Sequence, residues 1–430
     1  MNTISLLTLI IALATSLSMV VCMFFNAKIK KVSLYWIISL IGATTLLCIN
    51  HKNASQILGS LITDSSINPI KILVFFLSMV VLSIILDNLH FFEFVAQKCV
   101  KLAKNSQIKL FVIFYALVSI LTIFTSNDIV ILSFVPFICY FCKNCNINPI
   151  PFVFSTFVAA NTWSMIFIIG NPTNVYISSF AGIDFGTYFL KMALPTIATG
   201  TISFFVLLIL FYKQLKKEII VQNLDEIKIN KPLILLNSII LLVCTILLAI
   251  SSYINLEMWY IALCFMTFSI IINLIVSHFI KHEKRYIWQT AKKAPWAFVP
   301  FLISMFIIVM CLDVNGFTKI FAEFLAGGNA GFVYGFSSFL ASNVINNISM
   351  TTLFASILAN GSYNILGIYA TIIGSNLGAI FTPVGALAGI MFMNILKSKG
   401  INFPIWKFIV YGIIVSAIAL PTAIGVLLLV

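Results

Sequence analysis

Two short polar stretches interrupt long apolar runs of this sequence: Thr125-Ser126-Asn127-Asp128 in the first half and Ala341–Asn347 in the second. Polar side chains within such runs are costly in hydrocarbon, so we expect them to face protein, water or a solute. Ser, Asn and Asp also cap the starts of helices, where backbone amides carry partial positive charge and can hold an anion or a polar solute. Two polar breaks in matching halves are typical of the binding site of a transporter.

Each half contains a second break. Gly170-Asn171-Pro172-Thr173-Asn174 should stop a helix, because Pro removes a backbone donor and Gly permits unusual dihedral angles. Gly374–Gly378, followed by Thr382-Pro383-Val384-Gly385, should do the same. The freed carbonyls and the Asn and Thr oxygens are suited to coordinate a small cation or to hydrogen-bond a neutral hydroxide such as arsenous acid.

Asp128 has no acidic counterpart in the second half, where Val344 stands at the matching position. A desolvated carboxyl has a raised pKa and so can carry a proton at physiological pH. Asp128 is therefore the candidate coupling residue. The alternative is that it caps the returning helix and stays ionised beside a backbone amide. Asp87 and Asp313 lie near predicted span ends, where we expect them to anchor or cap.

The composition identifies the solvent of these elements as a lipid bilayer. Hydrophobic residues make up 61% and charged residues 9% of the 430 residues, whereas about a quarter of a soluble domain is charged. The net charge of +13 does not indicate nucleic-acid binding, because the basic residues lie between apolar runs. We expect an all-α polytopic membrane protein with spans near 3–25, 32–49, 71–90, 150–176, 187–212, 232–251, 258–279, 296–314, 363–395 and 404–430.

The lysine and arginine pattern predicts the topology of the remaining apolar stretches, 107–142 and 331–359. With both termini outside the cell, all but four of the 25 basic residues fall on the inner side; the exceptions are Lys52, Lys71, Lys191 and Lys319. This bias requires that each stretch enters and leaves on the same face. We therefore expect two re-entrant hairpins, with tips at Ser126-Asn127 and Ser342-Asn343, in a multi-pass protein of the inner (plasma) membrane.

Matching offsets reveal an internal repeat. The spacing from Ser78-Met79 to Asp87 equals that from Ser304-Met305 to Asp313. The separation of Asn161 from Asn376 equals that of Gly170 from Gly385, and the separation of Ser126 from Ser342 agrees with both to within one position. By the charge pattern the two copies are inverted, with five spans and one hairpin each. The expected domains are 1–212, with a broken helix at 150–176, a cytoplasmic connector at 213–231, and 232–430, with a broken helix at 363–395.

Several motifs together resemble a known family. They are Leu86-Asp87 through Phe91-Phe92-Glu93, the Ser126–Asp128 tip, AKKAPW at 291–296, SNVINN at 342–347 and GSNLGAIFTPVGALAG at 374–389. The sequence resembles the ArsB-type arsenical pump membrane proteins, within a superfamily that includes citrate-type and anion:sodium permeases. The resemblance implies an inverted repeat with two re-entrant hairpins. It also implies export of arsenite or antimonite, driven by protons alone or with a soluble ATPase subunit. Its motifs imply that substrate and ion contacts come from Ser126, Asn127, Asp128, Asn161, Asn171, Thr173, Asn174, Ser342, Asn343, Asn346, Asn347, Asn376, Thr382 and Gly385.

Two other constellations carry weaker predictions. Cys139, Cys142 and Cys145 are candidate thiolate ligands for trivalent arsenic. Apolar spans accumulate cysteine freely, however, and a site that must release its solute gains little from tight thiolates. His278 and His282 are four residues apart beside Glu283, but the H-E-x-x-H order of a metalloprotease is absent.

The leading hypothesis is a secondary active transporter that exports arsenite-like solutes in exchange for protons. A sodium-coupled permease for a carboxylate or an inorganic anion is the first alternative, and an uncoupled anion channel is the second. An enzyme is the weakest reading, since no phosphate-binding loop or nucleophile elbow occurs, and no cofactor is expected. The expected partners are the lipid bilayer, a small anion or metalloid hydroxide, and a proton or sodium ion. A homodimer and an ATPase subunit remain open.

Overall fold

The computed structural model describes residues 3–25, 27–29, 32–63, 68–103, 105–218, 229–251, 253–279, 286–361 and 364–430. These residues are almost entirely helical, apart from two short antiparallel strands, β1 (Lys28–Ile29) and β2 (Val32–Ser33). Eight described helices are long and apolar enough to cross a membrane, or nine if the pair spanning 34–60, bent by 91°, counts as one span. A helix satisfies its own backbone hydrogen bonds in lipid. The predicted all-α polytopic membrane fold is confirmed.

The helices occur twice in the same order, as the repeat predicts. The first copy consists of α1 (Thr3–Phe24), α2 (Leu34–Ile49), η1 (His51–Asn53), α3 (Ala54–Ser60), α4 (Pro69–Asn88), α5 (Phe91–Ala103), α6 (Gln107–Phe124), α7 (Asn127–Asn144), α8 (Ile150–Trp163), η2 (Ile168–Gly170), α9 (Pro172–Phe180) and α10 (Phe185–Leu215). The second consists of α11 (Lys231–Ala249), α12 (Met258–Phe279), α13 (Tyr286–Lys293), α14 (Phe298–Val314), α15 (Phe317–Leu325), α16 (Ala330–Ile345), α17 (Asn347–Asn360), α18 (Ile365–Phe381), η3 (Pro383–Gly385), α19 (Leu387–Ser398) and α20 (Ile405–Leu427). The 3₁₀ turns η2 and η3 are separated by the same offset as Asn161 and Asn376, as the repeat predicts.

The ten predicted spans correspond to α1, α2, α4, α8 with α9, α10, α11, α12, α14, α18 with α19, and α20. The helices α8 and α18 are short for membrane spans because a break interrupts each of them. Nearly every residue of α8 and α18 is buried, so these two broken helices form the centre of the molecule. The predicted connector at 213–231 includes residues 219–228, which lie outside the described part of the chain.

Helices α6 and α7 form a re-entrant hairpin. Gln107, the first residue of α6, donates to the carbonyl of Glu218 just beyond α10 over 3.4 Å. Asn148, shortly past the end of α7, donates to Gln214 in the last turn of α10 over 2.8 Å. Both arms of the hairpin therefore begin and end at the same end of α10. The two extended residues Thr125 and Ser126 make the turn between the arms.

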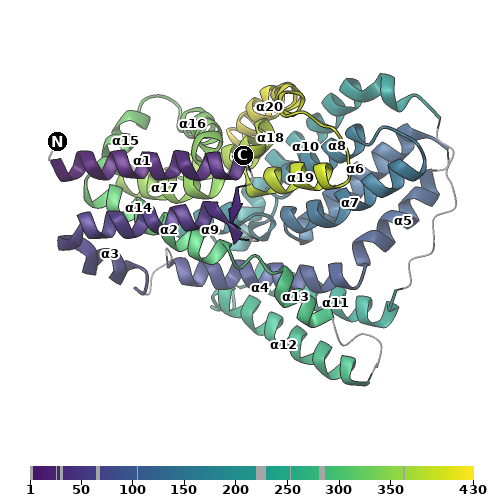
Figure 1. Ribbon diagram of the computed structural model, residues 1–430, viewed down its shortest axis with the longest axis horizontal. Coiled ribbons are helices and arrows are strands. Elements are labelled where there is room, and N and C mark those ends of the chain that lie inside the picture. Colours follow the sequence, from purple (N-terminus) through teal and green to yellow (C-terminus); the bar gives the residue numbers. More distant parts are fainter. Residues whose placement is uncertain are drawn as a thin grey trace.

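Helices α16 and α17 form the second hairpin. A Cβ added at Gly361, just after α17, would lie 3.6 Å from the hydroxyl of Tyr334 in the first turns of α16. The start of α16 and the end of α17 are therefore adjacent. Figure 1 shows α15, α16 and α17 at one end of the molecule and α5, α6 and α7 at the other. The two hairpins thus enter from opposite ends, as an inverted repeat requires.

The second hairpin turns at Asn346, so the prediction of a tip at Ser342-Asn343 is wrong by one helical turn. Asn346 has a positive φ of 69°, and its side chain caps α17 by accepting from the Ile348 amide over 3.2 Å. Ser342 and Asn343 lie in the last turn of α16. Aligned on the breaks, Asp128 corresponds to Ile348 instead of Val344 and still has no acidic counterpart.

The predicted second break occurs at Thr382-Pro383-Val384-Gly385, but Gly374–Gly378 does not interrupt the helix. Both glycines lie inside α18, where a Cβ on Gly374 would meet the Ser338 hydroxyl at 2.0 Å and one on Gly378 would meet the Ser342 hydroxyl at the same distance. Their role is to let α16 and α18 pack in close contact, which small residues permit between membrane helices. The break itself begins at Thr382.

The helices at the start of each repeat pack against the opposite repeat. α1 and α2 contact α14, whereas α11 and α12 contact α4. In Figure 1, α1 and α2 lie near α14, whereas α11 and α12 lie below α4. α4 in turn contacts α7 and α9, and α14 contacts α17, so these two helices lie beside the hairpins and the first break.

Candidate functional site

The tip of the first hairpin lies against the first broken helix. Asn127 donates from Nδ2 to Oδ1 of Asn161 over 3.1 Å, and Asn161 donates to the carbonyl of Phe157 over 2.8 Å. Oδ1 of Asn127 accepts from the backbone amide of Asp128 over 2.9 Å. Asn127 and Asn161 are buried, and the hydrogen bond between their side chains holds the tip of the hairpin against α8.

The second hairpin meets the second break in a similar way. Thr382 donates from its hydroxyl to Oδ1 of Asn343 over 2.6 Å, and Asn346 donates to the carbonyl of Val384 over 3.1 Å. A Cβ on Gly385 would lie 2.6 Å from the carbonyl oxygen of Gly378 and 2.8 Å from Oδ1 of Asn343. Only glycine fits at position 385.

Asn376 joins the two repeats. Its Oδ1 accepts from the Ser164 hydroxyl over 3.1 Å and from Asn171 Nδ2 over 2.8 Å. Its Nδ2 donates to Oδ1 of Asn174 over 2.7 Å. All four residues are buried. Ser164 was not predicted from the sequence, although a serine one turn after Asn161, at the start of a break, is a usable signal.

Several buried oxygens near the breaks have no hydrogen-bond partner among the described residues. They are Oγ of Ser126, Oγ1 of Thr162, Oγ1 of Thr173 and Oδ1 of Asn347. Such atoms are uncommon in folded proteins because an unpaired buried polar group costs free energy. They mark places where water, an ion or a solute oxygen would be stabilised.

A cavity of about 480 Å³ leads to the first tip. One wall is the face of α7 that carries Asp128, Ile129, Leu132 and Ser133. The rise of a helix from Ser133 back to Asp128 places Asp128 about 7.5 Å deeper along this wall. The opposite walls come from α4, α14 and α19 and are mostly apolar. Asp128 is half-buried and lies at the inner end of the cavity.

A polar cluster lies at the rim of this cavity. Asp87, near the end of α4, accepts from the Ser133 hydroxyl over 2.5 Å and from Nζ of Lys293 over 3.0 Å. The Lys293 side chain is 51% exposed, which places this cluster at the mouth. Asp313, the counterpart of Asp87, accepts from Thr318 and Asn360 at the end of α17. Both aspartates thus anchor neighbouring helices, as predicted; the sequence analysis missed Ser133 as a partner.

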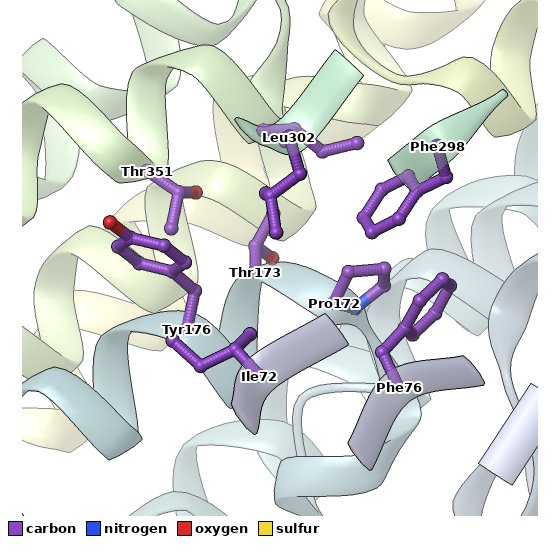
Figure 2. A pocket seen from close by; sticks show the side chains of 9 residues that line it. Ile72, Phe76, Pro172, Thr173, Tyr176, Phe298, Leu302 and Thr351 are labelled. Carbon is purple, nitrogen blue, oxygen red and sulfur yellow. The ribbon is translucent and has the colours of Figure 1, made fainter. Parts of the chain in front are cut away.

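An aromatic pair closes the inner end of the cavity. The rings of Phe76 in α4 and Phe298 in α14 have centroids 4.6 Å apart, and both residues line the cavity. On their other side they line a small pocket of about 10 Å³ together with α9 and α17. Figure 2 shows this pocket, with Phe76 and Phe298 on one side and Tyr176 and Thr351 on the other.

The structure brings most of the predicted contact residues into these clusters, but not the candidate metal ligands. Cys139, Cys142 and Cys145 are buried, and among the described residues no three His, Cys, Asp or Glu side chains are arranged to hold a metal ion. The structure therefore lends the three-thiolate site no support. The predicted set of His278, His282 and Glu283 lies outside the residues and side chains that the structure describes.

Comparison with known proteins assigns the chain to a family. A family model described as citrate transporter (CitMHS) matches residues 3–368. A Bacillus subtilis protein provisionally named an arsenical pump membrane protein is 26% identical over 372 residues, which cover 79% of this chain and 81% of that protein. The arsenical pump membrane protein of Escherichia coli is 23% identical over 369 residues, or 79% of this chain and 82% of its own.

The fold also resembles a solved structure. The YdaH transporter of Alcanivorax borkumensis, described as having an unusual topology, superposes with a TM-score of 0.56 at 13% identity over 99% of this chain and 98% of its own. At that identity the likeness concerns the fold alone. The family model matches most of the chain, and the inverted repeat agrees with it: this chain is a membrane transporter of the citrate transporter family.

Proposed function

We propose that the protein exports trivalent metalloid hydroxides, arsenite or antimonite, in exchange for protons carried by Asp128. The observation that carries this proposal is the charge distribution of the cavity. Asp128 lies at its inner end, whereas the described lysines that line it, Lys28 and Lys293, are exposed residues of the mouth. Lys293 is in addition paired with Asp87.

This distribution favours a neutral solute over a carboxylate substrate. A citrate-like anion in a low-dielectric cavity needs cationic side chains or several free donors around it. The inner end of the cavity instead offers one carboxyl group, Asp128, and most of the other residues that line the cavity are apolar, such as Leu132, Val80 and Leu387. Arsenous acid is uncharged near neutral pH and its hydroxyls can donate to a carboxylate. The arsenical pump names of two relatives support the same substrate class.

Coupling follows from competition at one carboxylate. The ionised form of Asp128 accepts a hydrogen bond from the solute, whereas the protonated form is neutral and needs no solute partner. A cycle that exchanges the two ligands on Asp128 links export of the solute to entry of a proton. This mechanism uses the proton gradient alone, and it requires neither an ATPase subunit nor a second copy of the chain.

The lysine pattern supports a cavity that opens toward the cytoplasm. Lys109, Lys216 and Lys217 surround a surface hollow where the first hairpin begins, and the mouth of the cavity carries Lys28 and Lys293. By the positive-inside rule these residues lie on the cytoplasmic side of the plasma membrane. The cavity then faces the cytoplasm, and both termini lie outside.

Sodium coupling is the second candidate, and one observation favours it. Oγ of Ser126 and Oδ1 of Asn347 have no partner among the described residues, and each residue stands at the turn of one of the two hairpins. Unpaired oxygens at both turns would suit a small hard cation at each. In that case the coupling ion is held by the tips and Asp128 plays a local role.

Reconstituted vesicles separate these alternatives. The proposal predicts that a proton gradient alone accumulates arsenite in proteoliposomes and that replacing sodium with choline leaves the rate unchanged. Citrate in large excess should not compete. Accumulation that depends on a sodium gradient would support the second candidate, and flux that never exceeds equilibrium would support a channel.

A further inference from the structure

The small pocket in Figure 2 is built from the repeat counterparts of the helices that line the large cavity. The cavity is lined by α7 and α19, whereas the pocket is lined by α17 and α9. In the order of elements α17 corresponds to α7, and α9 corresponds to α19. Each space therefore takes one of these helices from each repeat, and exchanging the two repeats turns one space into the other.

The correspondence extends to single positions. Asp128 lines the cavity and its counterpart Ile348 lines the pocket. Leu387 and Met391 line the cavity; the offset that relates Gly385 to Gly170 relates them to Pro172 and Tyr176, which line the pocket. The wall helices agree as well. The offset that relates Ser78 to Ser304 relates Ile72 and Phe76 of α4 to Phe298 and Leu302 of α14, and the pocket contains all four.

The two spaces differ in volume, about 480 Å³ against about 10 Å³, the latter close to the space of a single water molecule. The cavity is open at one end of the fold, and its counterpart, the pocket, is closed at the other. This is the arrangement expected of one of the two alternating states of a transporter built from an inverted repeat. The ring pair of Phe76 and Phe298 borders both spaces and separates them.

The chemistry of the pocket differs from that of the cavity. None of the nine described residues that line it is acidic or basic. Thr173 is 1% exposed, and its hydroxyl has no hydrogen-bond partner among the described residues. Figure 2 shows Thr173 between Thr351, Tyr176 and Pro172. The Thr351 hydroxyl donates to the carbonyl of Asn347 over 2.6 Å, and the Tyr176 hydroxyl is hydrogen-bonded to Thr352. Among the described residues that line the pocket, Thr173 therefore carries the hydroxyl without a partner.

We propose that this pocket is a second solute subsite, on the release side, where the Thr173 hydroxyl hydrogen-bonds an uncharged polyhydroxy solute after the Phe76–Phe298 pair has opened. The inference rests on the proposed function and adds a location and a ligand chemistry to it. Because Ile348 replaces Asp128 here, the solute meets a hydroxyl in place of a carboxylate. It is held more weakly than in the cavity, which favours release.

Cysteine accessibility tests the location. In an active variant without the nine native cysteines, Thr351→Cys should resist a membrane-impermeant thiol reagent from either side at rest. While a proton gradient drives arsenite transport, Thr351→Cys should react from the side opposite the cavity mouth. Leu132→Cys, on the cavity wall, is the matched control and should react from the mouth side. Reaction of Thr351→Cys from the mouth side, or from neither side during transport, would overturn the proposal.

Substitution of Thr173 tests the chemistry. Thr173→Val keeps the shape but removes the hydroxyl, and Thr173→Ser keeps the hydroxyl. We expect Thr173→Val to lower the maximal rate about tenfold, the effect of one lost hydrogen bond, with Thr173→Ser near the parent rate. Equal rates for the two variants would overturn the assignment. If the parent itself moves no arsenite, the proposed function fails; an active parent with equal variants refutes only the subsite.

Discussion

Asn376 of the second repeat donates from Nδ2 to Oδ1 of Asn174 in the first over 2.7 Å, and its Oδ1 accepts from Asn171 and Ser164. One amide therefore satisfies three buried polar side chains of the opposite repeat. It fixes the first break against α18 at the centre of the fold.

Removal of this amide should destabilise the protein. Asn376→Ala removes the partner of Nδ2 of Asn171 and of Oδ1 of Asn174, at a cost of about 1–3 kcal/mol for each buried group that finds no substitute, whereas the Ser164 hydroxyl still donates to the carbonyl of Asn161 over 2.9 Å. We expect a lower unfolding temperature in detergent and a loss of transport. The control is Thr422→Ala in α20, where the hydroxyl donates to the Ile418 carbonyl of its own helix, and it should change neither. An Asn376→Ala variant as stable as the parent would mean that water replaces the amide.

Gly385→Ala should disrupt the second break. The added Cβ would meet the Gly378 carbonyl oxygen at 2.6 Å, a backbone atom that cannot move without displacing α18. The matched control is Gly425→Ala, since a Cβ at this helical position meets no atom within 4 Å and alanine favours helix by about 1 kcal/mol. Thermal unfolding of the two variants should move in opposite directions. A Gly385→Ala protein with parental stability and transport contradicts the assigned packing.

His90 should make stability depend on pH. In the turn between α4 and α5, its Nδ1 lies 2.8 Å from Oε2 of Glu93, and this hydrogen bond raises the pKa of His90 and lowers that of Glu93. Asp87 and Lys293 also face His90. The stabilisation is complete below the unfolded pKa of about 6.5 and is lost as the pH rises through the higher native pKa.

His90→Gly isolates this effect. His90 has a φ of 59°, and its repeat counterpart Gly316 has a φ of 80°, so glycine fits the turn. The parent should gain stability relative to His90→Gly as the pH falls from about 8 to about 5.5, a range in which Glu93 stays ionised. Unfolding temperatures of both proteins across that range give the difference. A difference that is constant with pH would show that the pair contributes nothing.

The three cysteines of α7 and its C-terminal end should be dispensable. Cys139, Cys142 and Cys145 are buried, so their replacement by alanine removes thiols that the cavity does not reach. We expect cells that lack their own pump to keep full arsenite resistance with the triple variant, at matched protein levels on an immunoblot. A loss of resistance at equal expression would reinstate thiolate capture of the metalloid.

The sequence predicted the fold well because membrane spans follow from long apolar runs, and their orientation follows from how Lys and Arg are distributed between these runs. The repeat offset, read from Asn161 and Asn376, places η2 and η3 correctly because each break contains a Pro and a Gly. The tip of the second hairpin was misplaced because Ser342-Asn343 copies the motif of the first tip, whereas it is the Asn346 side chain that caps the following helix.

The cavity could not be predicted from the sequence. Asp128 was identified because a carboxylate in an apolar run is rare. Its position at the end of a 480 Å³ space depends on how α4, α14 and α19 pack around α7, which no local pattern encodes. Ser133 and Lys293 come from distant segments, and their shared acceptor Asp87 makes them partners only in the folded protein.

The most direct test of the account is proton coupling by Asp128→Asn, an isosteric change that keeps hydrogen bonding and removes titration. Arsenite uptake into everted vesicles is measured with and without a proton gradient, with Asp313→Asn as the control carboxylate at the other end of the fold. The account predicts that Asp128→Asn equilibrates arsenite without concentrating it, whereas Asp313→Asn still concentrates it. Uphill accumulation by Asp128→Asn at the parental rate would contradict the central claim.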